Sequence, residues 1–254
     1  MSAIIATERL GKRFGHFSAN SEIDFHVEPG ELRAVIGPNG AGKTTFFNML
    51  GGTTGASEGR ILFQGEDVTH LRGSARVRKG IAKAFQTANI YSEQTVMQNC
   101  RFAALAHIQG EFAMQTIRRS TRLAAVDDIA LEALEQLELT PVAHVRAGDL
   151  SHGDKKRLDI AIALATRPKL LLLDEPVAGM SIDETNKTEA LIRRLAARIT
   201  VLIIEHDMDM IMGISDSITV LHQGRILDQG TPAEIRASAK VQEAYLGGHV
   251  EETH

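Results

Sequence analysis

The chain has 254 residues, enough for one α/β domain with a modest subdomain and a large buried core. Its formal net charge of −4 excludes a basic field that would favour nucleic acid, and no stretch approaches the ~20 apolar residues of a membrane-spanning helix. The single cysteine, Cys100, excludes a disulfide framework and suits a reducing compartment. The N-terminal residues lack the pattern of a secretion signal, so we expect any membrane role to come through a partner.

The first part of the chain predicts short strands separated by turns. A short apolar run before a glycine-rich loop indicates a buried strand, and from Gly42 onward the pattern is helical. The strand expected at residues 60–63 follows two glycines that interrupt regular structure, Gly55 and Gly59. Strands are expected at residues 4–6, 23–27, 33–36 and 60–63.

The middle of the chain, residues 88–165, is predicted to be mostly helical. Residues 126–139 place apolar side chains at i, i+3 and i+4 spacing, which is typical of a helix with one buried face. Beyond residue 165, strands alternate with helices again. Residues 170–173 and 201–204 are wholly apolar, as strands of a central parallel sheet are. A helix is expected at residues 184–197, a hairpin at 218–221 and 225–227, and a flexible tail at 247–254.

The strongest motif is a glycine-rich loop between the expected buried strand and the following helix. It matches the pattern G-x-x-x-x-G-K-[ST] in the context that the pattern requires. Glycines let the backbone wrap phosphates closely, and the helix start attracts an anion. Lys43 adds a charge at the β- and γ-phosphates, and the Thr44 hydroxyl is a ligand for Mg²⁺. The residues of this phosphate loop are Gly37, Pro38, Asn39, Gly40, Ala41, Gly42, Lys43, Thr44 and Thr45.

Two carboxylates, Asp174 and Glu175, follow the apolar strand at residues 170–173. Ligands of open α/β sheets bind at strand ends, so Asp174 is expected to hold Mg²⁺ and Glu175 to polarise the attacking water. An adjacent pair of carboxylates at this place also fits a merely polar strand terminus.

Three further motifs resemble those of the ATP-binding cassette (ABC) ATPases. Residues 150–154, LSHGD, resemble the signature LSGGQ; Gln86 resembles the Q-loop glutamine, and His206 resembles the switch histidine. With the phosphate loop and the acidic pair they stand in the family's order. The resemblance covers nearly the whole chain. It implies a phosphate-loop NTPase fold: an α/β core with a parallel sheet and an antiparallel β subdomain, formed by residues 1–87 and 166–254, with a helical subdomain at residues 88–165.

The resemblance further implies a dimer that closes on Mg²⁺-ATP. Each ATP would lie between one copy's phosphate loop and the Ser151–Gly153 turn of the other copy. Gln86 would sense the γ-phosphate or Mg²⁺ and link the site to a membrane permease, and His206 would contact the γ-phosphate or position the attacking water. The protein is then expected in the cytoplasm, peripheral on the inner face of the membrane, with a solute-binding protein as an indirect partner. The dimer is either homomeric or formed with a related ATPase.

A finer resemblance is to the uptake ATPases for branched-chain amino acids and urea, carried by the segments GIAKAFQ, LSHG, DEPVAGMS, EHDMDMI and VLHQGRIL. Branched-chain amino acids are the expected solutes, and urea or another amide or amino acid is the alternative. Three residues depart from the wider family. His152 replaces a glycine, Asp154 replaces a glutamine, and Ser181 stands where many relatives have the D-loop aspartate, which puts that loop's cross-dimer contact in doubt.

An aromatic ring stacks on adenine in this family, and Phe14 is our prediction for it, with Phe17 as the alternative. An ordinary core or surface phenylalanine fits the position nearly as well. Two other classes of protein remain open. A non-transport ABC ATPase is disfavoured by the absence of sustained heptads and by the net charge. Another phosphate-loop enzyme, such as a kinase, leaves the signature and His206 unexplained.

Overall fold

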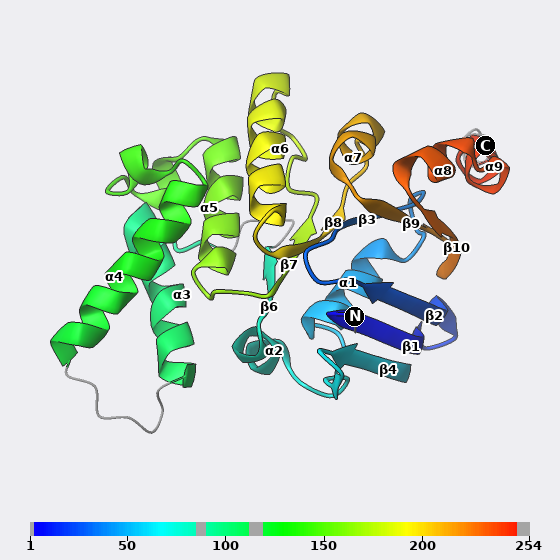
Figure 1. The fold of residues 1–254 in the computed structure, drawn as a ribbon, viewed down its shortest axis with the longest axis horizontal. Coiled ribbons are helices and arrows are strands. Elements are labelled where there is room, and N and C mark those ends of the chain that lie inside the picture. The colour runs from blue at the N-terminus through cyan, green and yellow to red at the C-terminus, as the bar shows by residue number, and fades with distance from the viewer. Residues whose placement is uncertain (1–2, 85–89, 112–118, 248–254) are drawn as a thin grey trace. The chain divides into compact units, whose positions relative to one another are not determined.

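The computed structural model describes residues 3–84, 90–111 and 119–247. These residues form two compact units (Figure 1). Unit 1 comprises Met1–Gly73 and Ala196–His254, and unit 2 comprises Ser74–Leu195. The predicted bounds of the helical subdomain, residues 88–165, fall inside unit 2 and stay a prediction. Within the described ranges no helix is both long enough and apolar enough to cross a membrane.

Unit 1 contains two sheets. The first is antiparallel, in the order β2-β1-β4-β5. In the second, β3 pairs in parallel with β8 and with β9, and β9 forms a hairpin with β10. The elements are β1 (Ile5–Phe14), β2 (Phe17–Val27), β3 (Leu32–Ile36), α1 (Lys43–Gly51), β4 (Glu58–Phe63), β5 (Glu66–Asp67), β8 (Thr200–Ile204), α7 (Met208–Ile214), β9 (Ser217–His222), β10 (Arg225–Gly230), α8 (Pro232–Ala237) and α9 (Ala239–Gly247).

The β1–β2 hairpin extends well beyond the two short strands predicted. Both strands carry an irregularity where a residue other than glycine has a left-handed backbone, at Arg9 (φ 47°) and Glu22 (φ 52°). Gly59, which the sequence suggested as a breaker, lies inside β4 beside Arg9. A Cβ atom at Gly59 would lie 2.3 Å from the Arg9 carbonyl oxygen. The glycine is therefore required by the close approach of two strands.

The core of unit 1 forms where α1 packs on the sheets. Phe46 and Phe47 are fully buried, and the Phe46 ring meets the Phe25 ring edge-on at 5.1 Å. Arg33 on β3 lies over the Phe25 ring, with its guanidinium carbon 5.5 Å from the ring centre. The expected strand at residues 33–36 and the helix after Gly42 are confirmed by β3 and α1.

Unit 2 contains the parallel pair β6 and β7, in which Ile81 is aligned with Leu170, and the helices α2 to α6. Figure 1 shows α3, α4 and α5 side by side. The apolar stripe predicted on residues 126–139 is buried along α4, although the helix ends at Gln136. Cys100 on α3 is fully buried, and burial raises the pKa of its thiol to about 12. The elements are α2 (Gly73–Lys79), β6 (Ile81–Ala84), α3 (Val96–Glu111), α4 (Arg119–Gln136), α5 (His152–Leu164), β7 (Leu170–Asp174) and α6 (Ile182–Ala196), with single 3-10 turns at Thr140–Val142 and Ala147–Asp149.

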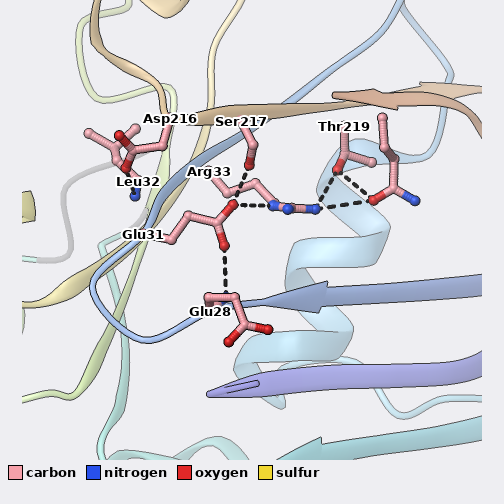
Figure 2. A network of polar contacts seen from close by, with 8 residues as sticks. Glu28, Glu31, Leu32, Arg33, Asp216, Ser217 and Thr219 are labelled. Carbon is pink, nitrogen blue, oxygen red and sulfur yellow. Dashed lines mark hydrogen bonds and ion pairs between the residues drawn. The ribbon is translucent and has the colours of Figure 1, made fainter. Parts of the chain in front are cut away.

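A partly buried ionic network ties the start of β3 to the start of β9 (Figure 2). The Glu31 carboxylate accepts hydrogen bonds from the Glu28 N–H at 2.7 Å, from Arg33 Nε at 2.8 Å and from the Ser217 hydroxyl. Arg33 also donates to Gln229 Oε1 on β10 at 3.1 Å. Burial alone would raise the pKa of Glu31. The hydrogen bonds from Ser217, Glu28 and Arg33 outweigh it and hold this pKa below 4.5.

We expect Glu31→Gln to lower the free energy of unfolding at pH 7 by about 1–3 kcal/mol, because charge-assisted hydrogen bonds are lost. Folding lowers the pKa of Glu31, so ionised Glu31 stabilises the folded protein at any pH above the unfolded-state pKa of 4.5. This stabilisation is lost as the pH falls through the pKa of the folded state. Urea unfolding from pH 7 to pH 3 should therefore show a shallower acid loss in the variant. Glu28→Gln, which keeps the backbone donor, is the matched control, and equal acid profiles for both variants and wild type would contradict the prediction.

Candidate functional site

The candidate residues are divided between the two units. Unit 1 carries the phosphate loop, Phe14 and His206, and unit 2 carries Ser151, Gly153, Asp174 and Glu175. Gln86 lies outside the described residues. The predicted tail at residues 247–254 lies outside them too, apart from Gly247 at the end of α9.

The phosphate loop joins the end of β3 to the start of α1. Its glycines have positive φ angles, 150° at Gly37, 75° at Gly40 and 94° at Gly42, a backbone conformation that favours glycine and is typical of anion-binding loops. Gly42 is the N-cap residue of α1 and supplies no side-chain cap to the first amides of the helix. These amides, together with the positive end of the helix dipole, suit a phosphate group.

Lys43 folds back over this loop. Its ammonium donates to the carbonyl oxygens of Gly37 at 2.6 Å and Pro38 at 3.0 Å, and the residue is 7% exposed. The charge is thus held beside the loop backbone. Thr44 is exposed and Thr45 is half-buried at the start of α1.

Two distant segments of unit 1 support the loop from outside. The Asn20 side-chain amide on β2 donates to the Gly42 carbonyl at 3.2 Å, and the Gly224 N–H in the β9–β10 turn donates to the Ala41 carbonyl at 3.1 Å. A Cβ atom at Gly37 would lie 2.1 Å from the Leu221 carbonyl oxygen. Sequence reasoning missed Asn20 and Gly224, because their contacts span long stretches of chain and follow no local motif.

Tyr245 on the C-terminal helix α9 lies near the phosphate loop. Burial raises the pKa of Tyr245 to about 12, against the opposing effect of the nearby Gly37 backbone amide. The tyrosine therefore stays protonated at physiological pH. No motif in the sequence singled out Tyr245, which precedes the tail predicted at residues 247–254.

The two aromatic candidates lie together at the tip of the β1–β2 hairpin. Phe14 pairs with Phe17 across the hairpin, and the side chains are 52% and 65% exposed. The Lys12 ammonium lies 5.0 Å from the centre of the Phe14 ring. Both rings keep a face for a planar partner, so the choice between them stays a prediction.

His206 follows β8 and is exposed. Its backbone N–H donates to Glu205 Oε2 at 3.0 Å.

In unit 2, the acidic pair stands at the carboxyl end of β7. Asp174 is 4% exposed, and its Oδ2 forms an ion pair with Lys83 Nζ on β6 at 2.9 Å. Among the described residues Asp174 Oδ1 is buried without a hydrogen-bond partner. A buried carboxylate oxygen without a donor is costly, and it suits a cation ligand.

Glu175 follows in a left-handed conformation, with φ at 52°, and is half-buried. Its carbonyl oxygen accepts a hydrogen bond from Lys156 Nζ on α5 at 2.6 Å. The change of backbone direction at the end of β7 separates the two carboxylates: one belongs to the buried strand and the other to the following loop.

The signature segment begins α5. Ser151 is the exposed N-cap residue, and its Oγ accepts the Asp154 N–H at 3.1 Å. Asp154 forms an ion pair with Arg157 on the next turn, so the acidic substitution has a local partner. Gly153 is buried against α6, where a Cβ atom would lie 2.6 Å from Glu184 Oε1.

The other two departures from the family pattern also have local contacts. His152 Nε2 lies 3.3 Å from the Ala178 carbonyl oxygen. Ser181 forms a reciprocal cap with Glu184 at the start of α6: its hydroxyl donates to Glu184 Oε2 at 2.9 Å, and its N–H donates to the same oxygen at 3.1 Å. Hydrogen bonds from Ser181 lower the pKa of Glu184. Ser181 therefore stabilises a helix start within the chain.

Comparison with known proteins assigns the family. Residues 21–178 match the model of the ABC transporter family, and the chain belongs to this family of ATPases. Residues 229–251 match a second model, described as branched-chain amino acid ATP-binding cassette transporter.

Individual relatives agree with this assignment. The chain is 41% identical to the high-affinity branched-chain amino acid transport ATP-binding protein BraF of Pseudomonas aeruginosa, over 96% of this chain and 98% of BraF. It is 38% identical to LivG of Escherichia coli, which has the same description, over 96% of this chain and 98% of LivG. Among solved structures, an ATP-binding cassette of an ABC transporter in its ADP conformation has a TM-score of 0.84 and 31% identity, covering 97% of this chain and 100% of that one. The predicted family, fold class and ATPase class are confirmed.

We expect Gly37→Ala to destabilise the protein more than Gly40→Ala, although both positions have positive φ. A methyl group at residue 40 meets nothing within 4 Å, so its cost is the left-handed strain of about 1–2 kcal/mol. At residue 37 the methyl group also collides with the backbone of Leu221, which adds about 1–3 kcal/mol. Urea unfolding of the two variants measures the difference, and equal losses would refute the steric argument.

We expect Lys83→Met to lower the free energy of unfolding by about 3–5 kcal/mol, because it leaves the Asp174 carboxylate buried without its cation. Adding Asp174→Asn to this variant should restore part of the loss, since the uncompensated charge is then removed. A double-mutant cycle in urea measures the coupling. Additive effects of the two substitutions would show that the ion pair contributes nothing.

Proposed function

We propose that this chain is the ATP-hydrolysing subunit of an ABC importer that drives uptake of branched-chain amino acids. The observation that carries the proposal is the phosphate loop, in which three glycines with positive φ and the Lys43 ammonium surround the uncapped start of α1. This arrangement provides amide donors and a cation for a triphosphate. The identity to BraF and the match at residues 229–251 support the choice of solute.

The chemistry follows from the charges that these residues bring to a triphosphate. Lys43 and the loop amides stabilise negative charge on the β- and γ-phosphates. Glu175 orients the attacking water or accepts its proton, and His206 contacts the γ-phosphate. Gln86 serves as a sensor of the γ-phosphate. Phe14 stacks on the adenine ring, with Phe17 as the alternative.

The donor set also fits Mg²⁺. Thr44 offers an exposed hydroxyl, Asp174 offers a buried Oδ1 without a donor, and Gln86 offers an amide oxygen. Oxygen ligands of this kind are those that Mg²⁺ prefers, with the remaining positions taken by water and phosphate. The ion would neutralise charge that develops on the phosphate oxygens during hydrolysis.

A second copy, or a related ATPase, would complete each ATP site with its signature. Two features of α5 support this role. Ser151 is exposed at the start of the helix and keeps a hydroxyl proton to donate, although its oxygen already accepts from the Asp154 N–H. A Cβ atom at Gly153 would meet the Glu184 side chain, so a larger residue there requires this carboxylate to move. ATP would then favour the closed dimer, and hydrolysis would release it.

A hollow in unit 2 supports the proposal that the chain docks on a membrane permease. This hollow, of about 300 Å³, opens between α2, β6, α3 and α5. Tyr91 and Phe102, whose rings meet edge-on at 5.4 Å, line it and are 63% and 46% exposed. Exposed aromatic side chains beside a hollow are typical of sites that take an apolar anchor from a partner. Docking there would keep the chain on the cytoplasmic face of the membrane, and a solute-binding protein would act through the permease.

We expect Glu175→Gln to reduce the rate of ATP hydrolysis by about 10²–10⁴-fold while ATP binding is retained, because a general base is lost and the phosphate contacts remain. The full-length chain would be assayed for phosphate release and for binding of a fluorescent ATP analogue. The same variant should accumulate as a dimer with ATP on gel filtration, and leucine uptake should cease in cells that carry it.

Lys43→Ala provides the contrasting control, since it should weaken ATP binding itself. Wild-type hydrolysis by Glu175→Gln would disprove the role of Glu175. A chain that stays monomeric with ATP in that variant would argue for another phosphate-loop enzyme.

A further inference from the structure

The peptide of Glu175 is held by a lysine from the signature helix. Lys156 lies one turn into α5, is 8% exposed, and donates from Nζ to the Glu175 carbonyl oxygen at 2.6 Å. Sequence reasoning gave Lys156 no role. Neither the phosphate loop nor the capping of α5 requires a cation at this position.

This hydrogen bond meets two physical requirements at once. Glu175 is not glycine, so its φ of 52° strains the backbone and persists only where the surroundings hold it. A buried ammonium is also costly unless it is hydrogen-bonded. The short bond between Lys156 and the Glu175 carbonyl fixes the orientation of that peptide, and with it the direction in which the Glu175 side chain leaves the backbone.

A second contact joins the same helix to the same segment. His152, in the first turn of α5, places Nε2 3.3 Å from the Ala178 carbonyl oxygen. Two side chains, from successive turns of α5, therefore contact the loop that follows β7 at residues 175 and 178. Ser151, the N-cap residue, stands at the end of this helix.

We propose that Lys156 is a positioning residue that holds Glu175 in its hydrolytic orientation and couples it to the signature helix. The inference rests on the proposed roles of Glu175 and Ser151. In the dimer, α5 of one chain would contact the nucleotide bound by the partner. Lys156 on the same helix holds Glu175, which acts on the nucleotide bound by its own chain. A shift of α5 on closure would thus be passed to Glu175, and the two ATP sites would be coupled through a single helix.

The test replaces Lys156 by methionine, glutamine or arginine in the full-length chain, with Lys155→Met as the matched control. Lys155 is the next residue on the same helix, is half-buried, and undergoes the same loss of charge. We expect kcat to fall about 10- to 100-fold in Lys156→Met, because a small displacement of a catalytic group has this effect. The dissociation constant for a fluorescent ATP analogue should stay unchanged, Lys156→Arg should recover most of kcat, and the Hill coefficient for ATP should fall toward 1 in Lys156→Met.

Wild-type kcat in Lys156→Met, or a loss no greater than in Lys155→Met, would overturn the inference. So would a parallel loss of ATP binding that Lys156→Arg does not repair, since that result indicates general damage to the fold. Should Lys156→Met fail to fold, Lys156→Gln decides: its shorter amide should leave kcat well below that of Lys156→Arg, and equal values overturn the proposal. Wild-type protein that hydrolyses no ATP would instead refute the proposed function, on which this inference rests.

Discussion

A loop that wraps an anion turns its N–H groups inward, and its carbonyl oxygens then need donors from elsewhere. In this chain Lys43 supplies the donor for Gly37 and Pro38, while Asn20 and Gly224 bind the carbonyls of Gly42 and Ala41. The phosphate loop therefore depends on β2 and on the β9–β10 turn as well as on its own motif. The β1–β2 hairpin and the β9–β10 hairpin thus both hold the backbone of the phosphate loop in a shape that its glycines alone would not keep.

A related constraint governs unit 2, where charged groups are buried. Asp174 is paired with Lys83, and Lys156 is paired with the carbonyl of Glu175. Each lysine comes from a different neighbour of β7, one from the adjacent strand and one from α5. The two acidic residues are consecutive in sequence, yet one is fixed through its side chain and the other through its peptide. This difference gives two identical functional groups separate environments, as the proposed metal ligand and the proposed base would require.

The sequence predicted the parts of this molecule that local physics determines. The apolar strands β3, β7 and β8 and the buried stripe of α4 follow from residue periodicity, and the start of α1 follows from the glycine-rich motif before it. The β1–β2 hairpin was underestimated, because its polar residues hide the alternation and its irregularities at Arg9 and Glu22 break the period. Lys83, Lys156 and Tyr245 escaped prediction for another reason: their partners are set by tertiary packing, and a single sequence contains no signal for such pairs.

Cys100 has a practical consequence for work on this protein. Its thiol is buried on α3 and its pKa is raised to about 12, so the thiolate that reacts with maleimides is almost absent at neutral pH. Since the chain has one cysteine, the native protein behaves toward such reagents as if it had none. A cysteine introduced on an exposed surface could then carry a fluorophore or spin label selectively, without first removing the natural residue.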